Sequence, residues 1–404
     1  MIPLFKAEKW DPDDWVQLAE DAGAKYFTVL SEFHDGFAMY DSSHTKWNSK
    51  NMGPKRDVTG ELAEAVRKRG MKFGISNHLA FNFHFYNHNH ANGFDASDPA
   101  THGLYTDGRG ATPEFVDMWW KRTTELVDKY QPDLYYFDWG WTHPSAGDAF
   151  VNARRDFFAY YYNKAIDWGS GTYGDPNVVI NYKSWKEFHP EVIGVPDQER
   201  GGAWQISPHV AQLDDAISIK SWSYSTIDNY KTPNFLVDAF VDLVSKNYCL
   251  QLAFGPKADG TIPDEYRTRL LELGKWLKVN GEAIYATRPY VIFGEGPTKS
   301  IKVENYKEMI TGTTKDIRFT RNKANTLLYA TVLDWPDEKL VIESFKAGKF
   351  DADKITRIEM LGGDGELQWQ QTDRGLEISL PAAPASDYAH AFRISFEGQV
   401  PAVK

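Results

Sequence analysis

The sequence predicts an α/β fold of the (β/α)8 barrel type over residues 1–288, followed by an antiparallel β-sandwich over residues 289–404. The main observation is that helix-like and strand-like segments alternate up to about residue 285, which is typical of parallel strands joined by crossover helices. After residue 289 the pattern changes to short alternating strands separated by turns, which is typical of a sandwich. A chain of 404 residues also exceeds one ordinary compact core, which favours two domains.

The α/β region starts with a helix, for which Asp11 is a suitable N-cap, Pro12 a suitable first residue and Gly23 a suitable end. The predicted strands that follow cover residues 25–30, 72–77, 134–138, 178–182, 191–195, 217–222 and 250–254. Predicted helices between several of them cover residues 59–69, 114–130, 150–166, 234–246 and 264–279. Seven strands are one fewer than a closed barrel has. We therefore expect an eighth strand to precede this sequence.

The β-rich region contains five predicted strands. They cover residues 327–333, 340–345, 355–361, 377–380 and 391–396, and turn clusters such as Gly362-Gly363-Asp364-Gly365 separate them. The region carries no obvious constellation of titratable groups. Packing against the barrel is therefore its expected role, and carbohydrate binding is the alternative.

Composition narrows the classes of function. The chain has a net charge of −11 and no run of Lys or Arg, so nucleic acid and anionic membranes are not expected as partners. No apolar stretch approaches the roughly 20 residues of a membrane span. Aromatic residues make up 15% of the chain, with 14 Trp and 21 Tyr, a composition that suits stacking on sugar rings as well as core packing. Cys249 has no second cysteine with which to form a disulfide.

Asp138 is the strongest candidate for a catalytic residue. An ionised Asp inside a buried strand is costly, so Asp138 should mark the C-terminal end of the strand 134–138, where barrel enzymes carry their catalytic groups. Tyr136, Trp139 and Trp141 are suitable walls for a sugar-binding pocket. The alternative is a structural Asp that is hydrogen-bonded to the following loop.

Hydrolysis of a glycosidic bond needs a second carboxyl group, because one acts as nucleophile or base and the other as acid. Glu199 follows a predicted strand and precedes a glycine-rich loop, so it is the first candidate. Glu187 and Glu191 are its competitors. The alternative for Glu199 is a surface residue paired with Arg200.

Two histidine-containing segments follow predicted strands. Glu32, His34 and Asp35 lie together after the first strand, and either ring nitrogen of His34 can hold a sugar hydroxyl, with a structural histidine as the alternative. His84, His88 and His90, with His78 nearby, form an H-x3-H-x-H pattern that is compatible with zinc. That segment is rich in Asn and has no Cys near it, so we interpret it as an active-site loop without a metal ion. No P-loop, dinucleotide-binding or G-x-S-x-G motif occurs.

Several short motifs occur in order along nearly the whole chain. They are AGAKY at 22–26, HDGF at 34–37, GPKRD at 53–57, FD at 137–138, SWSY at 221–224, GPKADGTIP at 255–263 and NGEAIY at 280–285. In these motifs the chain resembles the α-L-fucosidases of glycoside hydrolase family 29. Together the motifs are highly specific, whereas only the last two would be specific on their own.

The resemblance implies a retaining exo-hydrolase that acts on terminal α-L-fucose of an oligosaccharide or glycoconjugate, without a cofactor or metal. By position it implies that Asp138 is the nucleophile, that His34 binds a fucose hydroxyl, and that Glu199 is the acid/base. The sequence leaves the compartment open, and the resemblance favours a periplasmic or secreted enzyme. A homo-oligomer is an open alternative to a monomer.

The chain departs from the family pattern at several positions. Phe33 replaces the first His of the family's HHDGF motif, and Lys183 replaces an Arg, which exchanges a bidentate fork for a point charge. The stretch 73–78 lacks the usual Tyr-Tyr-Ser, and the stretch 251–254 reads QLAF where Leu-Leu-Asn is more familiar. The family's first strand, with its own sugar-binding His, would precede Met1. These changes concern sugar specificity more than the reaction.

The predicted substrate-binding set consists of His34, Glu32, Asn77, His78, Tyr136, Lys183 and Trp222. Three other functions stay open at this point: a degenerate or sugar-binding relative without efficient catalysis, a hydrolase for a related sugar such as α-L-galactose, and a metal-dependent hydrolase that uses the His-rich segment.

Overall fold

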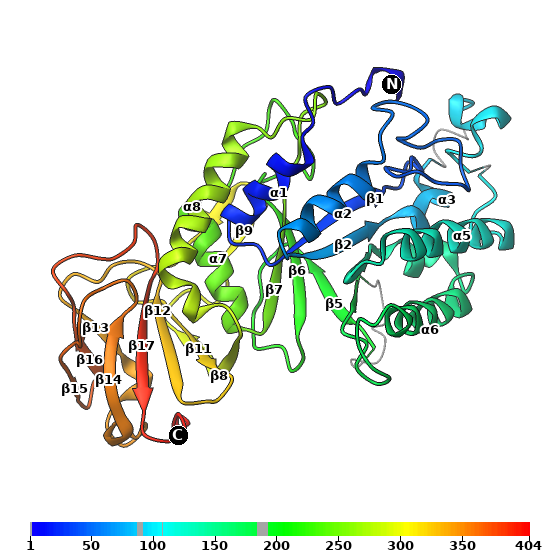
Figure 1. Ribbon diagram of the computed structural model, residues 1–404. Helices are drawn as coiled ribbons and strands as arrows, with labels where there is room; N and C mark the ends of the chain where they lie inside the picture. The colour runs from blue at the N-terminus through cyan, green and yellow to red at the C-terminus, as the bar shows by residue number, and fades with distance from the viewer. Residues whose placement is uncertain (1, 87–91, 107, 184–192) are drawn as a thin grey trace. The chain divides into compact units, whose positions relative to one another are not determined.

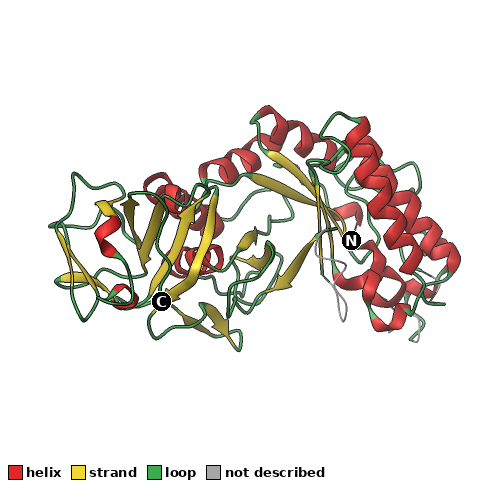
Figure 2. Cartoon of the chain, turned by 90° about the horizontal axis from the view of Figure 1, so that it is seen from below, coloured by secondary structure: helices red, strands yellow, loops and turns green. Residues whose placement is uncertain are grey.

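The computed structural model describes residues 2–86, 92–106, 108–183 and 193–404. The chain forms two compact units. The first unit comprises Met1–Glu20, Ala24–Asp197 and Pro256–Ile262, and the second unit comprises Asp21–Gly23, Gln198–Gly255 and Pro263–Lys404. The elements of both units are labelled in Figure 1 and coloured by type in Figure 2. A domain boundary at residue 288 stays a prediction from the sequence.

The first unit contains a parallel sheet whose strands follow one another in chain order. These strands are β1 (Tyr26–Glu32), β2 (Lys72–Asn77), β3 (Leu134–Phe137), β4 (Val179–Tyr182) and β5 (Val195–Glu199), whose last two residues belong to the second unit. The register pairs Asn77 with Phe137, and Phe137 with Tyr182. The C-terminal ends of β2, β3 and β4 therefore lie side by side, so that the residues following these strands meet at one edge of the sheet.

Helices precede or connect these strands, as a parallel sheet requires. They are α1 (Pro12–Asp21), α2 (Val58–Lys68), α3 (Asn82–Phe85), α5 (Pro113–Tyr130) and α6 (Val151–Asp167). Helix α2 begins where the Asp57 side chain accepts a hydrogen bond from Gly60 N at 3.0 Å, and it packs against β1 and β2. Its core-facing residues Leu62 and Val66 are fully buried. An N-cap and an apolar face thus suffice to explain this helix.

The second unit contains two more parallel strands, β6 (Ala211–Ala216) and β7 (Tyr248–Ala253). Helix α7 (Pro233–Ser245) connects them and packs against β7 and against α8 (Asp264–Asn280). The described part of the chain thus contains seven parallel strands, the number that the sequence predicts.

The positions of two of these strands differ from the prediction. Strand β5 starts at Val195, where the predicted strand 191–195 ends, and β6 covers 211–216 instead of 217–222. Both strands bury charged side chains, namely Asp197 on β5 and Asp214 on β6. Apolar runs do not indicate strands such as β5 and β6, whose buried positions are partly polar.

The rest of the second unit is antiparallel. One sheet contains β14 (Ile355–Met360), β17 (His390–Phe396), β12 (Leu327–Val332), β11 (Ile317–Asn322) and β8 (Thr287–Glu295), and another contains β13 (Lys339–Ile342), β16 (Leu376–Ser379) and β15 (Trp369–Gln371). A two-stranded sheet consists of β9 (Lys302–Glu304) and β10 (Glu308–Ile310). Residues of both larger sheets, such as Phe319, Phe392 and Leu376, share one hydrophobic core. The predicted fold class, a barrel-like α/β region followed by an antiparallel sandwich, is confirmed.

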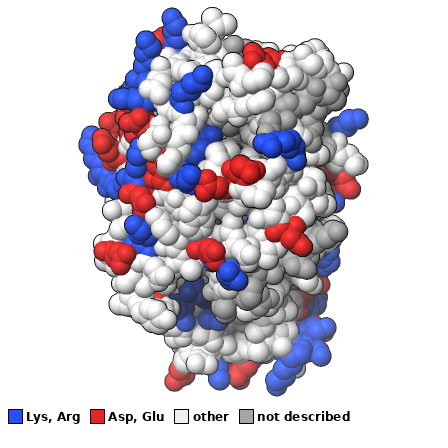
Figure 3. Space-filling view, turned by 90° about the vertical axis from the view of Figure 1, so that its right-hand side faces the viewer, with Lys and Arg blue, Asp and Glu red and all other residues white. Residues whose placement is uncertain are grey.

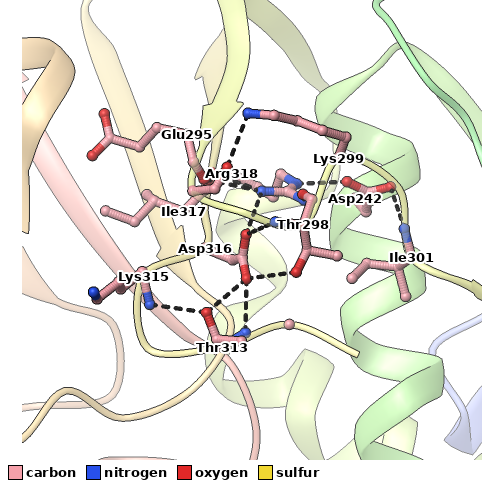
Figure 4. A network of polar contacts seen from close by, with 12 residues as sticks. Asp242, Glu295, Thr298, Lys299, Ile301, Thr313, Lys315, Asp316, Ile317 and Arg318 are labelled. Carbon is pink, nitrogen blue, oxygen red and sulfur yellow. Dashed lines mark hydrogen bonds and ion pairs between the residues drawn. The ribbon is translucent and has the colours of Figure 1, made fainter. Parts of the chain in front are cut away.

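A network of buried charges joins α7 to β11 inside the second unit (Figure 4). Asp242 on α7 accepts hydrogen bonds from Arg318 Nε at 2.5 Å and from Lys246 Nζ at 2.7 Å. It also accepts one from the backbone N–H of Ile301 at 3.3 Å, while Arg318 Nη2 donates to Thr298 O at 2.6 Å. The buried charges are thus paired with one another, which removes much of the cost of burying them.

On the face shown in Figure 3, acidic and basic side chains lie among one another. Within the described ranges, no helix has the length and the apolar character that crossing a membrane would require.

Candidate active site

The site lies where β1 to β4 end. The backbone ladder continues past the strands, because His78 N donates to Glu32 O at 2.9 Å and Lys183 N donates to Phe137 O at 2.9 Å. Asp138, directly after β3, therefore lies between residues from the ends of β2 and β4. Residues that are more than 100 positions apart in the sequence are thus brought together.

Asp138 is the centre of the site. It is 5% exposed, and its Oδ2 lies 3.3 Å from His34 Nε2 and 3.6 Å from His78 Nδ1. Its Oδ1 lies 3.5 Å from Lys183 Nζ. Burial alone would raise the pKa of Asp138, but the two histidines and Lys183 outweigh that effect and hold the pKa well below its ordinary value. The carboxyl group is therefore ionised at neutral pH.

The two histidines are fixed by neighbouring groups. His34 Nδ1 donates to the backbone carbonyl of His78 at 2.8 Å, which leaves Nε2 facing Asp138. His78 Nε2 lies 2.8 Å from Ser76 Oγ. Burial lowers the pKa of His78 to about 3, against the attraction of Asp138. At neutral pH the ring of His78 is thus uncharged, and Lys183 provides positive charge beside the carboxylate.

Lys183 lies between two carboxylates. Its Nζ is 3.5 Å from Asp138 Oδ1 and 4.0 Å from Asp197 Oδ2. The Asp197 side chain is fully buried, and Tyr136 Oη donates to its Oδ2 at 3.3 Å. The sequence interpretation missed Asp197, since it placed the strand before this residue. The signal that could have found it is the strand period of two, which puts Asp197 and Glu199 on one face of β5.

Glu32 and Asn77 form a buried layer beneath the histidines. Glu32 is fully buried and forms an ion pair with Arg122 of α5. Asn77 Nδ2 donates to Glu32 Oε2 at 3.4 Å and to Tyr135 Oη at 3.2 Å. Burial raises the pKa of Glu32 to about 7, although Arg122 opposes this shift. Both side chains are inaccessible to solvent, so their contacts are with protein groups.

Aromatic rings surround His34. The ring of Phe33 lies 4.5 Å from that of His34, the ring of Phe85 5.2 Å and the ring of Trp139 5.8 Å, measured between centroids. Phe33 and Phe85 are 38% and 42% exposed, which places apolar surface at the mouth of the site. Trp141, in contrast, is buried and stacks on Phe137, so it belongs to the core.

Glu199 and Trp222 belong to the second unit. Glu199 is exposed at the end of β5, and it lines a cavity of about 250 Å³ together with Arg200, Asp215 and Lys231. Trp222 is 39% exposed and lies on a loop, with the Arg200 guanidinium 4.4 Å above its ring. The approach of Glu199 to within about 5–5.5 Å of Asp138, which a retaining mechanism needs, stays a prediction. Glu187 and Glu191 lie outside the described residues.

His34, His78 and Asp138 also have the composition of a metal site. Their ligand atoms lie within 4.8 Å of one another, and two imidazoles with a carboxylate form a donor set used by zinc. The Lys183 ammonium group, 3.5 Å from Asp138, repels a second cation there, so the residues present fit a metal poorly. His84 contacts the rings of Phe81 and His143, whereas His88 and His90 lie outside the described residues.

Comparison with known proteins gives a consistent result. The family model described as Alpha-L-fucosidase matches residues 1–282, and that of the Alpha-L-fucosidase C-terminal domain matches residues 311–395. The chain is 31% identical over 396 residues to the tissue α-L-fucosidase of Rattus norvegicus, covering 96% of this chain and 75% of that protein. It is 30% identical over 400 residues to the Homo sapiens enzyme, covering 95% and 74%.

Solved structures agree with the sequence relatives. The Thermotoga maritima α-fucosidase in complex with fucose matches with a TM-score of 0.73 and 29% identity, covering 97% of this chain and 81% of that one. A further α-L-fucosidase matches with a TM-score of 0.74 and 28% identity, covering 98% and 79%. The resemblance read from the motifs is confirmed, and the chain belongs to the α-L-fucosidases of glycoside hydrolase family 29.

Proposed function

We propose that this chain is a retaining exo-α-L-fucosidase that releases terminal α-L-fucose from glycans by double displacement. The observation that carries the proposal is the state of Asp138, a nearly buried carboxylate that stays ionised at a strand end. A carboxyl group must be unprotonated to act as a nucleophile. The lysine and the two imidazoles beside Asp138 keep its carboxyl group in that state. The Thermotoga maritima relative, solved with fucose and with a mechanism-based inhibitor, supports fucose as the sugar.

The reaction would take place in two steps. In the first, an oxygen of Asp138 attacks the anomeric carbon while the bond to the leaving oxygen breaks, and protonated Glu199 gives its proton to that oxygen. In the second, Glu199 takes a proton from water, whose oxygen attacks the anomeric carbon and displaces Asp138. Fucose leaves with its anomeric configuration retained, and both carboxyl groups return to their starting states. The exposure of Glu199 supports its role, because leaving group and water must both reach it.

We assign the remaining residues by their accessibility. His34, His78 and Lys183 surround the Asp138 carboxylate and are placed to hold sugar hydroxyls next to the reacting carbon. Glu32, Asn77 and Tyr136 are buried, so they would position the site through protein contacts. Trp222, which is partly exposed, would stack on the substrate. A fucosylated oligosaccharide or glycoconjugate is the expected substrate.

Replacement of the nucleophile tests this proposal. Asp138→Gly should lower turnover of an aryl α-L-fucoside by roughly three orders of magnitude or more, because a covalent intermediate can no longer form. Azide should restore part of the rate by entering the vacated space, and the product should be a fucosyl azide of inverted configuration. Asp148→Gly, at an exposed position after β3, is the control and should retain activity. Near-normal turnover by Asp138→Gly would disprove the assignment.

A hydrolase for a related sugar is the second candidate. The exposed ring of Phe33 favours it, since this ring occupies the place of a family histidine beside His34 and offers a sugar no hydrogen bond. Rates on aryl α-L-fucoside and aryl α-L-galactoside, measured with the wild type and with Phe33→His, distinguish the two. A wild-type preference for the galactoside would replace fucose as the proposed sugar.

A further inference from the structure

We infer that Arg200 is a positioning residue for Glu199, which fixes the turn that carries Glu199 to the loop that carries Trp222. The inference rests on the proposed role of Glu199 as acid/base. Glu199, Arg200 and Trp222 all belong to the second unit. The backbone conformation of residues 199–202 and the contacts of the Arg200 guanidinium group support this role.

The turn after Glu199 has an unusual backbone. Arg200, Gly201 and Gly202 have φ values of +49°, +78° and +68°, so three consecutive residues are left-handed. Glycine tolerates this conformation, whereas for arginine it costs free energy. A non-glycine residue at the start of such a turn needs compensating contacts, and the side chain of Arg200 provides them.

The Arg200 guanidinium binds the loop 219–222 at three points. Its Nη1 donates to Ile219 O at 2.7 Å, and its Nη2 donates to Ser221 O at 3.1 Å. Its carbon Cζ lies 4.4 Å from the centre of the Trp222 ring. The side chain is only 13% exposed, and its Nε is 3.5 Å from Asp215 Oδ1. The planar fork of arginine matches two carbonyl groups and one aromatic ring at once, which lysine cannot do.

The other contacts of the turn restrict it further. Gln198 Nε2 donates to Arg200 O at 3.2 Å and to Gly202 O at 2.9 Å. A Cβ atom on Gly202 would lie 2.5 Å from Ile301 O, so Gly202 packs directly against that backbone. Ile301 is in turn bonded to Asp242 of the buried charge network. The backbone N–H of Arg200 also donates to Asp214 O at 3.0 Å. The turn is thus held at its end by packing, and at its beginning by this backbone bond together with the Arg200 side chain.

Loss of the guanidinium should therefore release the beginning of the turn, where Glu199 lies. The cavity of about 250 Å³ beside Glu199 and Arg200 gives the freed segment space to move. A displaced Glu199 would protonate the leaving oxygen poorly, whereas the attack by Asp138 would be unaffected. The expected defect is therefore specific to substrates that need acid catalysis.

The experiment compares kcat/KM for an aryl fucoside with a poor leaving group and for one with an activated leaving group. Arg200→Ala should lower the first value at least about 10-fold more than the second, and by no more than the 10²- to 10⁴-fold that general acid catalysis supplies. Any loosening of Trp222, which Arg200 also contacts, should lower both values alike. Arg200→Lys should restore only part of the difference. Hydrogen exchange of residues 198–203 should accelerate in Arg200→Ala.

Arg269→Ala is the matched control. Arg269 also donates to backbone carbonyls, of Lys231 and Glu265, and lies over an aromatic ring, Tyr230, but it touches neither the turn nor the loop 219–222. It should show no dependence on the leaving group. An equal loss on both substrates in Arg200→Ala, or the same pattern in Arg269→Ala, would overturn the inference.

Glu199→Ala, measured on the same two substrates, separates the two proposals. If it shows the leaving-group dependence and Arg200→Ala does not, the positioning role is wrong and the acid/base role stands. If Glu199→Ala itself shows none, the acid/base role is wrong, and the role of Arg200 is withdrawn with it.

Discussion

Lys183 Nζ lies 3.5 Å from Oδ1 of Asp138, whereas the imidazole nitrogens of His34 and His78 approach the other carboxylate oxygen, Oδ2. Each oxygen of the proposed nucleophile is therefore held by a different group. A carboxylate held on both oxygens keeps a fixed orientation relative to β3, and fixed orientation is a large part of how an enzyme lowers the barrier of a displacement.

Removal of the lysine should impair the nucleophile. Lys183→Ala should lower kcat/KM on an activated aryl fucoside by about 10²- to 10³-fold, because a positioned charge next to the reacting group is lost. The pKa of Asp138 should rise as well, which moves the acidic limb of the pH–kcat/KM profile to higher pH. Lys183→Arg should retain more activity than Lys183→Ala. An unshifted acidic limb in Lys183→Ala would contradict the proposed contact.

Asp197 and Tyr136 should act on the site through Lys183 as one unit. Asp197→Asn keeps the shape but removes the charge that shares the ammonium group with Asp138, and Tyr136→Phe removes the hydroxyl that binds Asp197. We expect each change to lower kcat about 10-fold, and the double variant to lower it by less than the product of the two, because residues in one network are not additive. A double-mutant cycle on kcat measures this coupling. Strict additivity would show that Tyr136 and Asp197 act separately.

His34→Ala should raise KM and lower kcat together. Contacts to sugar hydroxyls strengthen toward the transition state, so we expect a loss in kcat/KM of about 10²-fold. His102→Ala, at an exposed position, is the control. If His34→Ala changes only the temperature of unfolding, then His34 is a structural residue.

The neutral, half-buried His78 should make the protein less stable in acid. Its pKa falls from 6.5 to about 3 on folding, so the unfolded chain binds more protons between these pH values. The free energy of unfolding should therefore fall as the pH is lowered from 6.5 to 3, with a contribution from His78 of up to about 1.4 kcal/mol per pH unit. Urea unfolding at several pH values measures the slope. In His78→Asn the slope should be smaller, and an identical slope would contradict the lowered pKa.

Chelators should leave activity unchanged. The Lys183 ammonium group already occupies the electrostatic position that a metal ion would take beside Asp138. Activity before and after EDTA treatment, with and without added zinc, measures this. A loss of activity on EDTA treatment that added zinc reverses would show that the site binds a metal ion. That result would favour the metal-dependent hydrolase.

Much of the fold could be predicted because the sequence patterns that indicate its strands and helices are local. The run Leu134–Phe137 is apolar, buried and ends at a charged residue, so the strand and the position of Asp138 follow from the sequence alone. The five predicted sandwich strands correspond to β12, β13, β14, β16 and β17. Strands β5 and β6 were misplaced because they carry carboxylates, Asp197 on β5 and Asp215 on β6. Their ion pairs with Lys183 and Lys231, which lie on other segments, appear only in three dimensions.

Less of the site could be predicted from the sequence, because the site depends on the register between the parallel strands. Nothing local to Lys183 indicates that its ammonium group lies between Asp138 and Asp197, because parallel pairing of separate strands creates that arrangement. In the same way, the sequence shows Glu32 as a polar residue at a strand end, whereas its ion pair with Arg122 of α5 appears only in three dimensions.

The buried charges around Asp242 determine how far this protein can be divided. Arg318 of β11 supplies the guanidinium that Asp242 of α7 needs, so the partners lie on opposite sides of residue 288 in the sequence. A chain cut before β11 would remove Arg318 from this buried network and leave Asp242 paired with Lys246, which should lower stability. The C-terminal sandwich is therefore not an interchangeable module. A graft of another sandwich at this junction would need an arginine at the same place to restore the pairing of Asp242.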